Sequence, residues 1–236
     1  MRLKKVWTKI MYYRNLKVLQ SKVENYAKQI FKAYGNELVL KLEDYNLLED
    51  ENNCIESSTA IGFIIEEFLT SKISIYTKNH KEKEVIIHKK QISTTQSSYD
   101  SYAIFRNIFV MLNIKVEKLN SHNNAIAALN LLHNDYVQEN PEQIKVYLIL
   151  KINYKFDKSL KDQQRKIIIN NIYSFFLEEV DFQQGHKQDH RNWSSIFNKN
   201  SGRLLISKNF PKLDQNSISY QLTKEFLINI IKKNNK

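Results

Sequence analysis

Asp100, Asn113 and Lys115 are residues whose types and spacing could support chemistry. Twelve residues separate the aspartate from the Asn-Ile-Lys run, and the stretch from residue 98 to 118 alternates apolar and polar side chains. Successive side chains of a strand point to opposite faces, so Asn113, Lys115 and Glu117 are expected to share one face. A carboxylate beside a lysine ammonium could bind a divalent cation and orient a water. The same pair could also be an ordinary cross-strand ion pair.

A helix is expected directly before this hairpin, in the segment from residue 57 to 73. Its apolar side chains recur at helical spacing and form a stripe of Ile61, Ile64, Ile65, Phe68 and Leu69. Glu66 and Glu67 flank this stripe, so one of them could reach Asp100, or both could be ordinary exposed glutamates. We expect Glu66, because Gly62 lies one turn before it and has no side chain to keep a strand or a phosphate away.

The remaining elements must form the scaffold of this hairpin. Helical spacing is expected at residues 5–34, 123–141, 161–180 and 220–236. Strands are expected at 84–88, 144–156 and 202–207. This order predicts a mixed α/β or α+β fold in which helices cover a sheet. With 4 glycines and 2 prolines there is no sign of a linker, so we expect one domain over residues 1–236, with a helical region at 1–50.

The composition narrows the class of partner. The 236 residues carry a formal net charge of +11, which favours a polyanionic partner because neutralised phosphates release counterions. The abundance of Lys, Asn and Ile also fits AT-rich coding, which would raise lysine without nucleic-acid binding. No apolar run approaches the roughly 20 residues that span a bilayer, so we expect a cytoplasmic protein without membrane contact. The single cysteine, Cys54, excludes an internal disulfide.

A polar segment near the C-terminus could contact DNA. It lies at about residues 183–207 and contains side chains of the types that bond base edges and phosphates, namely His186, Lys187, Gln188, His190, Arg191, Asn192 and Arg203. We expect it to be a DNA-recognition segment, and the alternative is a polar surface loop.

The pattern of Asp100 followed by Asn113-Ile114-Lys115 resembles the PD-(D/E)xK nuclease signature, an aspartate on one strand followed by acid-x-lysine on the next. The upstream TAIGFIIEEFL is similar to the helix before this hairpin in many type II restriction endonucleases, where a glutamate supports the metal site. The resemblance covers roughly residues 57–156, the expected catalytic core. Asn113 stands in the acid position without negative charge, and Glu117 lies too far along the strand to replace it.

This resemblance implies a restriction-endonuclease-like mixed central β-sheet flanked by helices. It implies that Asp100, Glu66 and the main-chain carbonyl of Ile114 hold Mg²⁺, with Asn113 as a candidate further ligand. Lys115 would then orient the attacking water. The implied activity is that of a sequence-specific type II restriction endonuclease, which cleaves double-stranded DNA and leaves 5′-phosphate ends.

A homodimer is expected for such an enzyme, because two active sites must face two strands. A cognate DNA methyltransferase is the expected functional partner. Two alternatives remain open. One is another nuclease of the same fold that acts in repair or on structured DNA, and the other is a nucleic-acid-binding module without catalysis.

Overall fold

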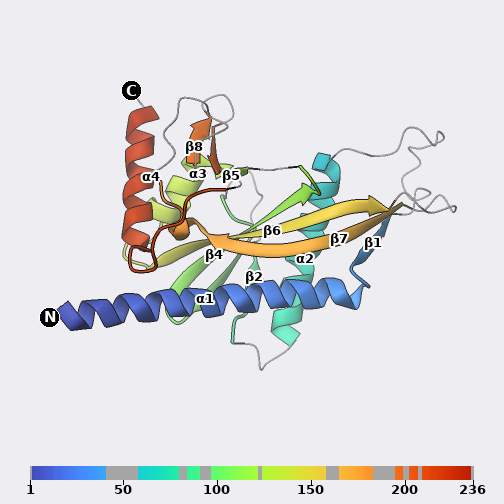
Figure 1. Ribbon diagram of the computed structural model, residues 1–236, viewed down its shortest axis with the longest axis horizontal. Coiled ribbons are helices and arrows are strands. Elements are labelled where there is room, and N and C mark those ends of the chain that lie inside the picture. Colours follow the sequence, from blue (N-terminus) through green and yellow to red (C-terminus); the bar gives the residue numbers. More distant parts are fainter. Residues whose placement is uncertain are drawn as a thin grey trace.

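A six-stranded mixed sheet with the order β1-β7-β6-β4-β3-β2 forms the centre of the computed structural model (Figure 1). The structure describes residues 2–40, 58–79, 84–90, 97–121, 124–157, 165–182, 195–198, 202–206 and 209–234. The strands of the sheet are β1 (Glu37–Leu40), β2 (Ile87–Lys89), β3 (Ser101–Phe105), β4 (Ile108–Lys118), β6 (Lys145–Asp157) and β7 (Arg165–Phe176). β4 and β6 run parallel, and the other neighbours are antiparallel.

Helices and a second sheet cover the two faces. The helices are α1 (Arg2–Ala33), α2 (Ser58–Asn79), α3 (Leu129–His133), the π-helix η2 (Asn134–Gln138), the 3₁₀ helix η3 (Leu177–Glu179) and α4 (Tyr220–Asn234). The second sheet has the order β5-β9-β8 and consists of β5 (Ala125–Ala128), β9 (Arg203–Ile206) and β8 (Ser195–Asn198). The predicted mixed sheet flanked by helices is confirmed. In the described part of the chain, no helix combines the length and apolar character needed to cross a bilayer.

Strand β4 contributes to both cores, because its side chains alternate between the two faces of the sheet. Leu112 and Ile114 belong to the core that α1 and α2 cover. Met111 belongs to the second core, together with Tyr147 of β6 and residues of α3, η2, β9 and α4. The sheet is therefore buried on both faces along β4 and β6, as is usual where strands run parallel.

The helix predicted for residues 161–180 is wrong, because residues 165–176 form strand β7. Its ladder with β6 shifts register so that Asn170 is an extra residue, which is a β-bulge. Beyond a bulge the inward side of a strand changes parity. Ile169 and Ile172, on either side of the bulge, both face the core and are consequently three residues apart, a spacing that is also typical of a helix.

The helix predicted for residues 123–141 is partly wrong. Residues 125–128 form β5, which pairs with β9 although alanine favours helices in isolation. Helical structure follows at residues 129–138, as α3 and η2, and ends before Pro141. The N-terminal region predicted as helical, residues 1–50, contains strand β1 in addition to α1.

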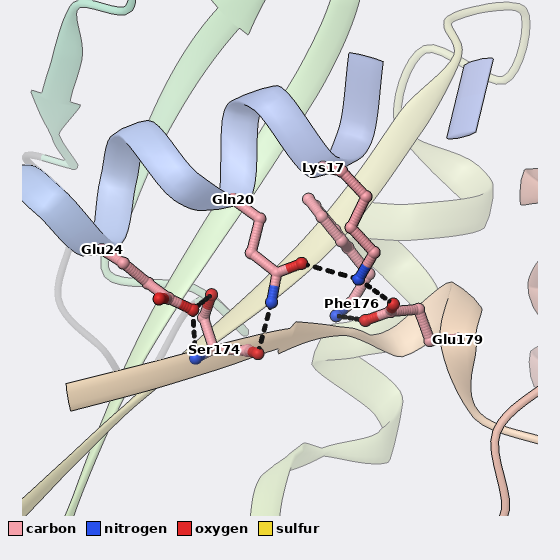
Figure 2. A network of polar contacts seen from close by, with 6 residues as sticks. All are labelled: Lys17, Gln20, Glu24, Ser174, Phe176 and Glu179. Atoms are coloured by element: carbon pink, nitrogen blue, oxygen red, sulfur yellow. Dashed lines mark hydrogen bonds and ion pairs between the residues drawn. The ribbon is translucent and has the colours of Figure 1, made fainter. Parts of the chain in front are cut away.

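Polar side chains of α1 cover the part of β7 that β1 does not reach (Figure 2). Glu24 Oε1 accepts hydrogen bonds from the main-chain N–H and the Oγ of Ser174, both at 2.8 Å. Gln20 Nε2 donates to the Ser174 carbonyl at 2.6 Å, and Lys17 pairs with Glu179 at 2.5 Å. These contacts satisfy edge groups that would otherwise lack partners.

Glu178 is a fully buried acid at the end of the sheet. It accepts hydrogen bonds from Tyr136 Oη at 2.5 Å and from the main-chain N–H of Tyr147 at 3.1 Å. Burial raises the pKa of Glu178 from 4.5 to about 8. Near neutral pH this side chain is therefore mostly protonated in the folded protein.

The substitution Glu178→Gln is expected to remove a pH dependence of stability. This dependence lies between the ordinary glutamate pKa of 4.5, expected in the unfolded chain, and the pKa of about 8 in the folded protein. Above the ordinary pKa of a glutamate the unfolded chain loses this proton while the folded protein keeps it, so the wild type should lose stability as pH rises toward 8. Urea unfolding at about pH 5 and about pH 9 measures the difference. The exposed Glu225→Gln is the control, and an equal pH dependence in wild type and Glu178→Gln would contradict the prediction.

Candidate active site

The candidate site forms where β4 extends beyond its neighbour β3. The described pairing of β3 with β4 ends at Leu112, whereas β6 pairs with β4 from Phe109 to Lys118. We call the β3 side of residues 113–118 the open edge of β4. Alternate N–H groups of a strand point the same way, so the N–H groups of Ile114 and Val116 both point to this edge.

Two carboxylates from different elements bind these N–H groups. Asp100, just before β3, accepts the N–H of Ile114 at 2.7 Å. The N–H of Val116 lowers the pKa of Glu66, on α2, so this carboxylate lies beside that N–H. Helix α2 passes close to β4 here, since a methyl group at Gly62 would lie 3.9 Å from the Val116 Cβ. The two acids are therefore held at adjacent positions along one edge.

Lys115 lies between these two positions on β4 and is half-buried. Burial raises the pKa of Glu66 to about 7, although Lys115 opposes this shift, and Asp100 adds to it. Burial also raises the pKa of Asp100, opposed by Lys115 and then by the Ile114 N–H. The structure thus brings Glu66, Asp100 and Lys115 into one electrostatically coupled group.

Glu67 occupies a different position. Its carboxylate pairs with Lys89 at 2.7 Å, and both side chains are exposed. Among the groups that shift the pKa of Glu66 and of Asp100, Glu67 has the smallest effect. Of the two neighbouring glutamates, Glu66 makes the direct contact with β4.

Asn113 uses its amide nitrogen to hold other groups. Nδ2 donates to the Ser98 carbonyl and to Tyr147 Oη, both at 2.6 Å. Its Oδ1 is buried and has no hydrogen-bond partner among the described residues. The amide therefore contacts the segment before Asp100 rather than supplying the missing charge.

Glu117, which shares a face with Lys115, is bound by side chains of β6 and β7. It pairs with Lys151 at 3.2 Å and accepts hydrogen bonds from Asn153 Nδ2 at 2.9 Å and from Tyr173 Oη at 3.0 Å. These contacts connect β4, β6 and β7.

The donor set suits a hard divalent cation. Mg²⁺ is commonly bound through one or two carboxylates, with substrate oxygens and waters as the other ligands. Glu66 and Asp100 are two such carboxylates, and a cation between them would offset the cost of their burial. Within the described ranges, no group of three or more His, Cys, Asp and Glu side chains could hold a metal ion. A cation here would need main-chain, substrate or water oxygens as further ligands.

Most of the predicted DNA-recognition segment cannot be placed. Residues 183–194, 199–201 and 207–208 lie outside the described residues. They include His186, Lys187, Gln188, His190, Arg191 and Asn192. Arg203 is described, begins strand β9 and is exposed.

Asp135 also contacts the segment before Asp100, and no spacing in the sequence indicated this contact. One signal was available. Asp135 lies beside Tyr136 and three residues after Leu132, and all three side chains are buried. An acidic residue on the buried stripe of a predicted helix needs a specific partner.

No protein-family model and no curated protein match this sequence. Among solved structures, the chain is similar to one described as NlaIV restriction endonuclease, with a TM-score of 0.39 and 15% identity over 74% of this chain and 75% of that chain. A TM-score of 0.39 is too low to support an inference about this chain. The function of the site is therefore inferred from the side chains that form it.

Proposed function

We propose that this protein is a metal-dependent nuclease that hydrolyses phosphodiester bonds of double-stranded DNA. The observation that carries the proposal is the pair of carboxylates, Glu66 and Asp100, on the open edge of β4 with Lys115 between them. Both acids have raised pKa values because of burial, and a bound cation would favour their ionised forms. The net charge of +11 supports a polyanionic substrate.

In this mechanism Glu66, Asp100 and the main-chain carbonyl of Ile114 would hold Mg²⁺. The bound cation would polarise a phosphoryl oxygen and lower the pKa of the attacking water. Lys115 donates a hydrogen bond that orients this water, and its positive charge offsets the charge that develops on the phosphate. Attack on phosphorus displaces the 3′ oxygen and leaves a 5′-phosphate and a 3′-hydroxyl.

We further propose that cleavage is sequence-specific, as in a type II restriction endonuclease. The resemblance of residues 57–156 to the PD-(D/E)xK signature and the polar residues at 183–207 support this. A homodimer would present two sites to the two strands. A cognate DNA methyltransferase would protect the same sequence in the cell.

One observation favours a second candidate, a nucleic-acid-binding module without catalysis. Asn113 occupies the position of an acid in the signature and adds no negative charge to the site. In that case Glu66 and Asp100 serve only to satisfy the N–H groups of the open edge.

Digestion of mixed double-stranded DNA tests these functions. The purified protein is incubated with Mg²⁺ or Mn²⁺, with a chelator as the control, and the DNA ends are sequenced. Cuts at one discrete sequence with 5′-phosphate ends are the expected result. Scattered or structure-dependent cuts would indicate another nuclease, and bound but intact DNA with both metals would contradict catalysis.

A further inference from the structure

The segment Ser97–Asp100, which leads into β3, is buried although it has no regular secondary structure. Ser97 and Ser98 are 6% and 4% exposed. Buried backbone groups outside ladders and helices need other partners. Asp100 ends this segment, and its own N–H donates to the Leu112 carbonyl at 3.0 Å, so the segment and β4 together position it.

Asp135, on the π-helix η2, binds the start of this segment through one carboxylate oxygen. Oδ2 accepts the main-chain N–H and the Oγ of Ser98, both at 2.7 Å, and the Oγ of Ser97 at 3.2 Å. Lys145 Nζ donates to the main-chain carbonyl of Asp135 at 2.7 Å, which ties η2 to β6.

The carbonyl side of Ser98 is held by the central sheet. Asn113 Nδ2, on β4, donates to this carbonyl at 2.6 Å. Tyr147 Oη, on β6, donates to the same carbonyl. Ser98 is therefore held at both of its peptide groups, at the N–H by Asp135 and at the carbonyl by β4 and β6.

Lys90 holds the remainder of the segment. Its main-chain N–H donates to the Asp100 carbonyl at 3.1 Å, and its Nζ donates to Ser97 Oγ at 2.6 Å. The same ammonium lies 3.9 Å from the centroid of the Tyr99 ring. The contacts of Asp135 are thus part of a continuous support that ends at Asp100.

We propose that Asp135 is a positioning residue, which holds Ser98 and so fixes the direction of the Asp100 carboxylate. This inference rests on the proposed nuclease function of the site. Asp135 acts through Ser97 and Ser98 and does not contact the substrate. Its removal leaves buried donors unsatisfied, and relieving this cost requires the segment to move.

The variants Asp135→Ala and Asp135→Asn test the proposal through the amide hydrogen exchange of Ile114, measured by NMR. The Ile114 N–H donates to Asp100 Oδ2 at 2.7 Å, so its protection reports the position of that carboxylate. Exchange is expected to accelerate in both variants. The effect should be larger for alanine, because asparagine keeps an acceptor oxygen.

Activity and metal binding provide the second set of readouts. In Asp135→Ala, kcat for DNA cleavage and the affinity for Mn²⁺ are each expected to fall by about 10- to 100-fold, as when an outer contact to a metal ligand is lost. The KM for DNA should stay unchanged, because Asp135 is not part of the DNA-binding surface. If Asp135 only stabilised the fold, its replacement would lower the free energy of unfolding. It would not lower kcat while leaving KM unchanged.

Glu24→Gln is the matched control. Glu24 binds the N–H and the Oγ of Ser174, as Asp135 binds those of Ser98, but it joins α1 to β7 outside the candidate site (Figure 2). Ile114 exchange, Mn²⁺ affinity and cleavage are expected to match wild type in this variant.

Two results would overturn the inference. One is unchanged Ile114 exchange in the folded Asp135 variants, and the other is the same loss of Mn²⁺ affinity and kcat in Glu24→Gln. If Asp135→Ala does not fold, Asp135→Asn decides the question by the same measurements. If the wild type neither binds Mn²⁺ nor cleaves DNA, the proposed function fails, and Ile114 exchange still decides whether Asp135 positions Asp100.

Discussion

Asp100→Asn is expected to lower the rate of DNA cleavage by at least about 100-fold, the upper end of the loss caused by mutating an outer contact to a metal ligand. Asparagine keeps an oxygen that can accept the Ile114 N–H, which Asp100 accepts at 2.7 Å. The open edge of β4 should therefore stay satisfied and the fold should survive. The substitution removes the negative charge and replaces one carboxylate oxygen by an amide NH2, so a loss of cleavage reports the role of the carboxylate.

Lys115→Gln is expected to reduce the cleavage rate on the order of 10²- to 10³-fold, the usual loss when one group that stabilises developing charge is removed. Glutamine can still donate a hydrogen bond to a water, but it cannot offset charge on the phosphate. Lys155→Gln, an exposed lysine on β6, is the control for the loss of one positive charge.

Initial cleavage rates and urea unfolding of the same preparations separate catalysis from stability. The reading in which Asp100 and Lys115 form only an edge contact predicts a different outcome. Asp100→Asn would then cleave as the wild type does, or neither protein would cleave with Mg²⁺ or Mn²⁺. Either result would remove the catalytic assignment of both residues.

Local sequence was sufficient to predict the hairpin that carries Asp100 and Lys115. Its turn consists of Arg106 and Asn107, with φ of 49° and 65°, a conformation that asparagine adopts more readily than most residues. The alternation along β4 then decides which side chains reach each core. Both features depend on neighbours in the chain, so they can be predicted without knowledge of the fold.

Long-range geometry could not be predicted in the same way. The sequence favoured Glu66 over Glu67 only through the position of Gly62, whereas the packing of α2 on β4 is what brings Glu66 beside Asp100 and Lys115. The bond between Ser98 and Asp135 spans 37 residues and joins an irregular segment to a π-helix. Nothing in the local pattern of either segment indicates the other.

Strand β7 shows how an irregularity can also mislead the local pattern. A single extra residue, Asn170, places the core residues Ile169 and Ile172 three positions apart, a spacing that is typical of a helix rather than of a strand. The register with β6 shows the correct assignment, and that register is a property of the assembled sheet.

Glu66→Gln is expected to weaken Mn²⁺ binding by at least about tenfold and to remove most of its dependence on pH. Burial raises the pKa of Glu66 to about 7, so the carboxyl is mainly protonated at lower pH and mainly ionised at higher pH. A divalent cation binds the ionised form, and below this pKa it must displace the proton. The wild-type affinity should therefore rise with pH, by up to about tenfold per unit below 7, and level off above it.

Calorimetric titration with Mn²⁺ at about pH 6 and about pH 8, in buffers of different ionisation enthalpy, measures both the affinity and the protons released. Glu67→Gln is the matched control, since Glu67 is the next residue of α2 and its carboxylate pairs with Lys89 at 2.7 Å. It should bind Mn²⁺ as the wild type does. An equal loss of Mn²⁺ affinity in Glu66→Gln and Glu67→Gln would show that any negative charge near α2 supports binding. An unchanged pH dependence in Glu66→Gln would mean that this carboxylate is not the group that loses its proton to the cation, and the charge that Asn113 lacks would then have to come from elsewhere.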